Sequence, residues 1–304
     1  MARRGELGAR SGHPSEMCSG APRAVISITA YARCRTYIQA MSTTNNRAAW
    51  IQGPSARCET IPEGALLPWR LILLGAPGVG KGTQAELLNR HMRACHLSTG
   101  DVFRAAGSRP DCEQSPAMKE ALGYMRRGDL VPDSTVWEMV RERSRCLHCS
   151  GGFILDGFPR TLGQAKSLKE LMDQQRLKLT AVVNYTLPFS EIVARLGGRR
   201  TCENCKAVYH VLERPPKVDG KCDHCESRLF LREDDRPESI KVRLEAYERS
   251  TAPLIGFYRS LDLLVEVAAK GSADDIFEST FTQLEARRVR EVAQKVLVAQ
   301  EDRQ

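Results

Sequence analysis

The segment GAPGVGKGT, residues 75–83, has the residue types and spacing of a phosphate-binding loop. It follows an apolar run, residues 70–74, and precedes a helical pattern that begins at Lys81. Glycines let successive backbone N–H groups turn toward phosphate oxygens, the helix N-terminus adds its positive dipole end, and the lysine reaches the outer phosphates. We therefore prefer a nucleotide-phosphate site over a glycine turn of purely structural purpose.

One residue departs from the strict pattern of such loops, which places Ser or Thr directly after the lysine to hold Mg²⁺. Here Gly82 follows, and the hydroxyl comes one residue later at Thr83. We therefore expect Mg²⁺ to be held by substrate phosphates and water, with carboxylates behind them. Asp101 and Asp156 are the candidates, because each follows an apolar strand, where an unpaired carboxylate would be costly. Helix N-capping is an alternative role for Asp101.

Two Cys-x-x-Cys pairs, residues 202–205 and 222–225, are separated by sixteen residues. Four thiolates at this spacing suit one tetrahedral Zn²⁺, and the turn residues between the pairs could not form a core unaided. A metal site is therefore preferred over four reduced thiols. A further pair, Cys146 and Cys149, has no second pair at such spacing, and we interpret it as a surface turn with two free thiols.

Short apolar runs alternate with helical patterns from Trp69 onward. The predicted strands lie within residues 70–78, 95–100, 151–160, 180–188 and 263–269, and the predicted helices within 81–92, 118–128, 136–144 and the C-terminal segment. Such alternation predicts an α/β fold, in which helices cover both faces of a parallel sheet. Ligands of such folds bind at the carboxyl ends of the strands, where the phosphate loop and Asp156 are expected.

Composition limits the class of protein further. At 304 residues and 42% hydrophobic, the chain can bury a core, and no apolar run approaches the ~20 residues that span a bilayer. Half of the net charge of +8 lies in the first 68 residues, which favours an arginine-lined nucleotide pocket over a broad nucleic-acid surface. Eleven cysteines, an odd count in a long chain, favour a reducing compartment with a metal site over a disulfide scaffold.

Residues 1–68 are rich in Ala, Ser, Arg and Gly and have weak periodicity. We expect this extension to be poorly ordered. It is compatible with an organelle transit peptide, or with a start codon placed too early, with Met41 as a later candidate. We assign it no function.

The loop variant occurs together with STGD at 98–101, DGFPRT at 156–161 and TAPLI at 251–255. In this combination and order, the sequence resembles the adenylate kinases from about residue 70 to 284. The resemblance implies reversible, Mg²⁺-dependent transfer of the ATP γ-phosphoryl group to AMP, giving two ADP, in adenine nucleotide homeostasis. It also implies a structural Zn²⁺, with a cytoplasmic monomer expected and no nucleic acid or membrane as partner.

Two other functions stay open. One is a kinase of the same class with a different nucleoside monophosphate as acceptor. The other is a nucleic-acid-binding or scaffold protein in which the cysteine module is the working part, although that module lacks the basic and aromatic stripe of a single-strand binder.

By the same resemblance, the chain divides into a P-loop NTPase-type core, an AMP-binding lobe and a zinc-ribbon-like lid. After the extension, 1–68, the core takes residues 69–97, 132–195 and 236–304, the last with the C-terminal helix. The AMP-binding lobe takes 98–131 and the lid takes 196–235.

The resemblance also assigns site residues. It places ATP at Gly78, Val79, Gly80, Lys81, Gly82, Thr83, Arg195, Arg199, Val208 and Tyr209. It places AMP at Thr99, Arg104, Asp129, Leu130, Val131, Gly157, Phe158, Pro159, Arg160, Gln164, Arg232 and Arg243. The catalytic set is Lys81, Asp156, Arg199, Arg232 and Arg243, and the metal ligands are Cys202, Cys205, Cys222 and Cys225.

Arginine suits these positions, because its planar fork binds phosphate through two parallel hydrogen bonds and cations stabilise the moving phosphoryl group. Asp234 and Asp235 are expected to pair with these arginines, with solvated surface charge as the alternative. The segment 266–272 lacks the Asp-Gly common in the family, which leaves the wall around the ATP base undetermined.

Overall fold

The computed structural model describes residues 68–107, 116–142 and 144–301. The chain divides into two units, 1–44 and 45–304, and the first lies outside the described residues. The expectation of poor order for 1–68 therefore also falls outside them, apart from Pro68. Within the described ranges, no helix is long and apolar enough to cross a membrane.

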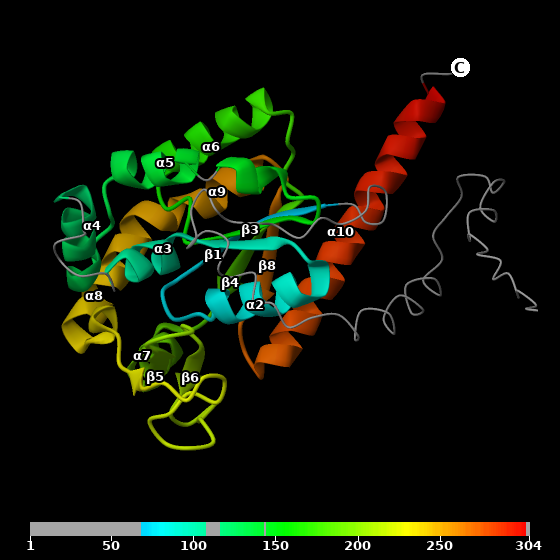
Figure 1. Ribbon diagram of the computed structural model, residues 1–304. Helices are drawn as coiled ribbons and strands as arrows, with labels where there is room; N and C mark the ends of the chain where they lie inside the picture. Colours follow the sequence, from blue (N-terminus) through cyan, green and yellow to red (C-terminus); the bar gives the residue numbers. More distant parts are fainter. Residues whose placement is uncertain (1–67, 108–115, 143, 302–304) are drawn as a thin grey trace, which may run out of the picture. The chain divides into compact units, whose positions relative to one another are not determined.

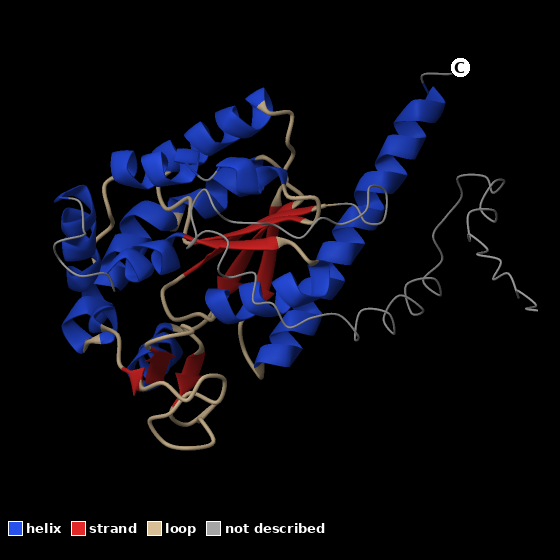
Figure 2. Cartoon of the chain, in the orientation of Figure 1, coloured by secondary structure: helices blue, strands red, loops and turns tan. Residues whose placement is uncertain are grey.

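A five-stranded sheet, in the order β2-β3-β1-β4-β8, forms the centre of the core (Figures 1 and 2). Its strands are β1 (Trp69–Gly75), β2 (Cys95–Ser98), β3 (Gly152–Asp156), β4 (Ala181–Thr186) and β8 (Leu264–Ala268). All neighbouring pairs are parallel. The α/β fold predicted from the alternation is thus confirmed, and the carboxyl ends of the strands meet at one edge.

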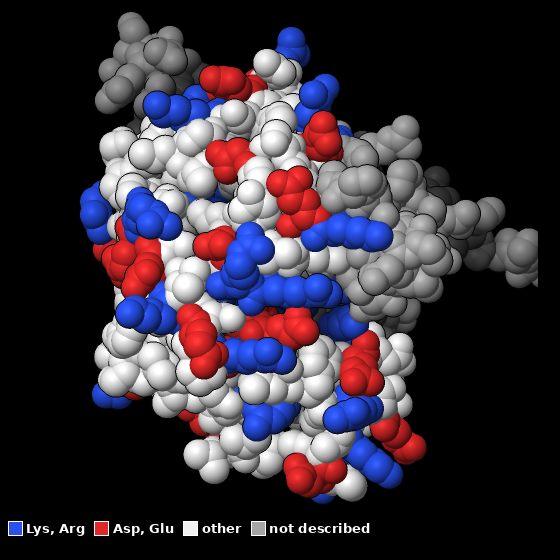
Figure 3. Space-filling model, turned by 90° about the vertical axis from the view of Figure 1, so that its left-hand side faces the viewer, with Lys and Arg blue, Asp and Glu red and all other residues white. Residues whose placement is uncertain are grey.

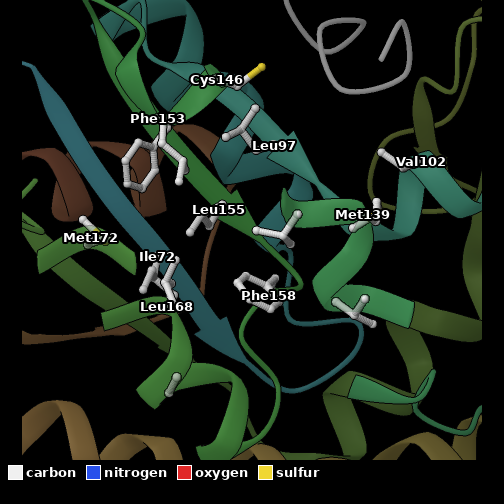
Figure 4. Close-up of a cluster of buried hydrophobic side chains, with 14 of the residues drawn as sticks. Ile72, Leu97, Val102, Met139, Cys146, Phe153, Leu155, Phe158, Leu168 and Met172 are labelled. Atoms are coloured by element: carbon white, nitrogen blue, oxygen red, sulfur yellow. The ribbon is translucent and has the colours of Figure 1, made fainter. Parts of the chain in front are cut away.

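Successive side chains of each strand point to opposite faces of the sheet, and each face packs against its own helices. On β1, Leu71 and Leu73 belong to one buried cluster and Ile72 and Leu74 to the other. The first cluster includes residues of α2 (Lys81–Met92) and α10 (Ala273–Glu301). The second, shown in part in Figure 4, includes residues of α3 (Thr99–Gly107), α4 (Pro116–Arg127), α5 (Asp133–Glu142), α6 (Leu162–Gln174) and α9 (Pro253–Ser260).

A small antiparallel sheet, in the order β6-β5-β7, carries the cysteine module. Its strands are β5 (Arg199–Cys202), β6 (Val208–His210) and β7 (Leu229–Phe230). The chain enters it from α7 (Phe189–Gly198) and leaves through the 3-10 turn η5 (Glu233–Asp235) into α8 (Pro237–Ala246), followed by a π-helical turn, η6 (Tyr247–Thr251). Buried side chains of α7 and α8 pack together, so the two connections lie side by side.

The interpretation of Cys146 and Cys149 as a surface turn is wrong. Cys146 lies in a 3-10 turn, η4 (Ser144–His148), Cys149 follows directly, and both side chains are buried, 6% and 8% exposed. Both belong to the buried cluster shown in part in Figure 4, which also contains Leu97 and Phe153. The pattern of small and polar residues around the pair gave no sign that this turn closes over the sheet.

Candidate active site

A cavity of about 650 Å³ opens at the carboxyl ends of the strands. This volume lies within the ~300–1,000 Å³ typical of sites for small molecules. The predicted residues that line it are Gly78, Val79, Gly80, Lys81, Gly82, Thr83, Asp101, Arg104, Asp129, Leu130, Asp156, Gly157, Pro159, Arg160, Arg195, Arg199, Val208, Tyr209, Arg232, Asp234 and Arg243. The structure therefore brings most of the predicted site together from distant parts of the chain.

Two glycines shape the loop between β1 and α2. Gly80 precedes the first residue of α2 with φ +103°, a conformation that favours glycine, and no atom lies within 4 Å of where its Cβ would be. Gly78 has φ +85°, and a Cβ there would lie 2.6 Å from Cγ of Leu196. The first glycine leaves open space at the helix N-terminus, and the second permits close packing against α7.

Lys81, the first residue of α2, donates through Nζ to the carbonyl oxygens of Gly75 at 2.6 Å and Ala76 at 2.9 Å. Burial lowers the pKa of Lys81 from 10.5 to about 7; Asp156 opposes the shift, and the nearby arginines add to it. The ammonium group is thus held among other cations, and a polyanion in the cavity would restore its charge.

Two carboxylates lie near the carboxyl edge of the sheet: Asp156 is the last residue of β3, and Asp101 lies in the first turn of α3, directly after β2. Burial raises the pKa of Asp156, but a hydrogen bond from His96, 3.4 Å away, and the charge of Lys81 more than offset this, so the pKa is below its ordinary value. Asp101 is buried and accepts a bond from Arg104 at 2.7 Å. Its own N–H donates to Ser98 Oγ at 3.3 Å, so Ser98, rather than Asp101, has the capping position.

Asp235 joins arginines from both ends of the cysteine module. Its carboxylate, 1% exposed, accepts from Arg199 Nε at 2.6 Å and from Arg243 Nη1 at 2.8 Å. Asp234 lies 3.2 Å from the same nitrogen of Arg243, and the arginines outweigh the effect of burial and hold its pKa well below the ordinary range. The predicted pairing is confirmed. Solvated surface charge, the alternative, is wrong for both acids.

Other arginines retain an excess of positive charge in the cavity. Burial, with repulsion from Arg104 and Arg199, holds the pKa of Arg232 well below its ordinary value. Its Nε donates to Thr201 Oγ1 at 2.7 Å. Loss of hydration and the charge of Arg243 lower the pKa of Arg160, an exposed residue of the cavity lining, to about 10. Cations held this close together indicate a site built for several phosphate groups.

The face that carries α4 and α8 has a band of basic side chains with acidic ones beside them (Figure 3). Over α4, Arg126 pairs with Glu233 at 3.1 Å and Arg127 with Asp129 at 3.3 Å. Both pairs are exposed and contribute little to stability. Asp129 also lines the cavity, so this mixed surface reaches the cavity wall.

A small adjoining cavity of about 30 Å³ contains the remaining predicted contacts. Thr99, Val131 and Gln164 line it together with Leu130 and other residues of the main cavity. The Gln164 amide is held at both ends, since its Oε1 accepts from the Arg160 N–H and its Nε2 donates to Asp133, each at 2.7 Å.

Phe158 lines neither of these cavities. Its side chain is fully buried in the core, 6.0 Å from the Trp137 ring. The structure thus gives this side chain a packing role between α5 and β3, and we no longer place it in contact with a ligand.

Several lining residues were missed by sequence reasoning. Gly271, Ser272, Ala273 and Ile276 form part of the wall that the segment 266–272 left undetermined, and His210, Glu213, Tyr247 and Thr251 also line the cavity. Nδ1 of His210 accepts from two backbone N–H groups, which places the proton on Nε2, a buried atom without a hydrogen-bond partner in the described part of the chain. Neither its spacing nor its neighbours distinguish His210 in the sequence.

The four cysteines of the module fit a zinc ion. Their sulfur atoms all lie within 4.8 Å of one another, with Cys202 to Cys225 at 3.4 Å and Cys205 to Cys222 at 3.5 Å. Tetrahedral ligands at ~2.3 Å from zinc would be separated by roughly 3.8 Å. A small rearrangement of the four side chains therefore suffices.

Comparisons with known proteins agree on one family. The adenylate kinase family model matches residues 73–263. The chain is 45% identical over 218 residues to an adenylate kinase of Thermodesulfovibrio yellowstonii, which covers 72% of this chain and all of the relative. It is 48% identical over 206 residues to an adenylate kinase of Geotalea uraniireducens, an alignment that covers 68% of this chain and 93% of the relative. It is 43% identical over 216 residues to an adenylate kinase of Archaeoglobus fulgidus, where the alignment covers 71% of this chain and 96% of the relative.

Proposed function

Because the chain belongs to the adenylate kinase family, we propose that it transfers the γ-phosphoryl group of ATP to AMP, reversibly, giving two ADP. The observation that carries this proposal is the joining of the phosphate loop and five arginines, Arg104, Arg160, Arg199, Arg232 and Arg243, in one cavity. A site for one phosphate chain does not need so many cations, whereas two nucleotides that meet end to end do.

ATP is assigned to the side of the cavity formed by α2, α7 and the cysteine module. Backbone N–H groups of the loop and the α2 N-terminus hold its phosphates, with Lys81 at the outer ones. The base lies between Arg195, the β6 residues Val208 and Tyr209, and the wall beginning at Gly271. Mg²⁺ bound with ATP would neutralise phosphate charge, and the ionised Asp156 would hold its water ligands.

AMP is assigned to the side formed by α3, α4 and β3. Arg104 and Arg160 bind its phosphate, while Thr99, Val131 and Gln164 contact the base in the adjoining cavity. Because two hydrogen bonds fix the Gln164 amide, its donor and its acceptor have a single orientation, which suits recognition of the edge of a base.

The transfer itself needs no general base, because the AMP phosphate is already an anionic nucleophile. Catalysis then rests on in-line positioning and on cations around the moving phosphoryl group, supplied by Lys81, Arg199, Arg232 and Arg243. Closure of the lid and the AMP-binding lobe would exclude water and so prevent hydrolysis of ATP. This division into lobes, with boundaries at 98–131 and 196–235, is part of the proposal.

We assign a structural Zn²⁺ to Cys202, Cys205, Cys222 and Cys225, where it would fasten the lid. The buried cluster within the lid contains just Cys202, Tyr209, Cys222 and Leu229, too few apolar groups to stabilise it alone. A cytoplasmic monomer without a nucleic-acid partner stays a prediction.

The acceptor is tested by measuring turnover of Mg·ATP with AMP, GMP, CMP and UMP side by side. We expect kcat/KM for AMP to exceed the others by at least about 100-fold, because a hydrogen-bonding site rejects a base with the wrong edge. Comparable turnover with another monophosphate would change the acceptor but keep the reaction class. No turnover, with salt-sensitive oligonucleotide binding, would contradict the kinase assignment.

The lowered pKa of Lys81 predicts that the protein takes up a proton when a nucleotide binds. With its pKa lowered to about 7, Lys81 is mostly neutral at pH 8 in the free protein. Phosphate charges raise that pKa, so binding takes up at most about 0.9 proton at pH 8, and less as the pH falls to 6, where the lysine is already charged. Calorimetry of a non-hydrolysable ATP analogue in two buffers of different ionisation enthalpy measures it. An equal uptake by Lys81→Met would contradict the assignment.

A further inference from the structure

A pair of cysteines lies in the core, apart from the nucleotide cavity and the lid. Cys95, the first residue of β2, donates through Sγ to Sγ of Cys149, 2.8 Å away. Their side chains are 4% and 8% exposed. Neither residue lines the two cavities described above, so the reaction proposed for the site gives this pair no task.

We propose that Cys95 and Cys149 are an oxidation site, a dithiol that a hydroperoxide converts into a disulfide. A disulfide needs its sulfur atoms ~2.05 Å apart. The two sulfurs therefore have to approach by less than about 1 Å. The alternative is that both thiols act as small apolar groups that fill the core.

The sheet fixes the backbone on both sides of the pair. Cys95 lies opposite Phe153 in the parallel pairing of β2 with β3. Cys149 accepts a hydrogen bond from the N–H of Gly152, the first residue of β3, at 2.8 Å. The strands thus hold the thiols together, and bond formation requires only a local adjustment of side chains and of one turn.

Cys149 is the thiol that a hydroperoxide reaches first, because its neighbours His148 and Ser150 are both exposed. Its sulfur attacks the peroxide oxygen, the O–O bond breaks, and an alcohol or water leaves, giving a sulfenic acid. The sulfur of Cys95 then attacks that of Cys149, the S–O bond breaks, and the hydroxyl leaves as water with the thiol proton. Two thiols lose two electrons, and the peroxide gains them.

The disulfide would close a loop that contains the whole AMP-binding lobe. The two cysteines are 54 positions apart. The segment between them contains α3, α4 and α5. A cross-link of this length restricts the unfolded chain and should raise the melting temperature by roughly 5–15 °C. Since the pair does not line the cavity, turnover should be retained.

The test uses the full-length protein with its lid zinc retained, treated with hydrogen peroxide and then with dithiothreitol. Peptide mass spectrometry under non-reducing conditions should find Cys95 joined to Cys149, and the rise in melting temperature should reverse on reduction. Cys95→Ala and Cys149→Ala should lose both effects. Cys146→Ala, a matched change at a buried cysteine of the same cluster, should retain them.

Three results would overturn the proposal. The first is peroxide-treated wild-type protein in which the peptides of Cys95 and Cys149 stay unlinked. The second is a cross-link from either residue to Cys146 in its place. The third is a rise in melting temperature that persists in Cys95→Ala, which would assign the effect to other thiols of the chain. The wild-type peptide map decides the question even where a variant folds poorly, and none of these results depends on the acceptor of the proposed reaction.

Discussion

Replacing Lys81 by methionine should lower kcat for ADP formation from ATP and AMP by about 10²–10³-fold, the usual cost of removing one charged donor from the transferred group. Methionine has nearly the same length, so it removes the ammonium while the space stays filled. The measurement is turnover with saturating Mg·ATP and AMP, because saturation separates the loss of transition-state stabilisation from weaker binding.

Thermal stability should not fall in this variant. The native protein holds the Lys81 ammonium in a buried position that lowers its pKa to about 7, so burial of this charge opposes folding. Lys169→Met on α6 is the matched control, since Lys169 is half exposed and pairs with Asp173 on its own helix at 2.5 Å. Undiminished turnover in Lys81→Met, or an equal loss in Lys169→Met, would remove Lys81 from the proposed mechanism.

Replacing Cys222 by alanine should release the lid metal and melt the lid at least about 10 °C below the rest of the protein. Cys222 is both a proposed ligand and one of the four buried residues of the lid cluster. With the metal gone, the remaining apolar groups cannot offset the conformational entropy of about forty ordered residues, 196–235. Metal analysis and scanning calorimetry measure the two effects.

Turnover at low temperature is the discriminating readout for Cys222→Ala. We expect it to persist there, because the ligand thiols are proposed to fasten the lid and do not contact the nucleotides. Cys146→Ala is the control, a buried cysteine outside the lid whose loss should leave the metal in place. A zinc-free variant that stays folded but loses turnover equally would show that the metal has a role beyond fastening the lid.

The core of the fold was predictable because its strands are short apolar runs, each followed by a helical pattern. Parallel strands buried on both faces give this signal directly, as the run before Gly75 does. The site was predictable where a residue belongs to a motif, as Lys81, Arg104 and Arg160 do. Their meeting in one cavity follows from the parallel sheet, which brings the ends of β1, β2 and β3 to one edge.

The rest depended on tertiary contacts that leave no periodic signal. His210 faces the cavity because two backbone N–H groups of the following turn hold its ring. Gly271 lines the cavity because it lies in the loop between the end of β8 and the start of α10. The burial of Cys146 and Cys149 arises from packing of a 3-10 turn onto β2 and β3, a contact between segments some fifty residues apart.

The contact between Arg199 and Asp235 has a consequence for protein engineering. These residues stand at the two ends of the lid, and their side chains meet at 2.6 Å. The proposed lid is therefore an insertion between two helices that pack against each other, and side chains from its two ends meet. Such an insertion can be exchanged for a relative's lid, or for a short turn, without a change in the strand order of the core.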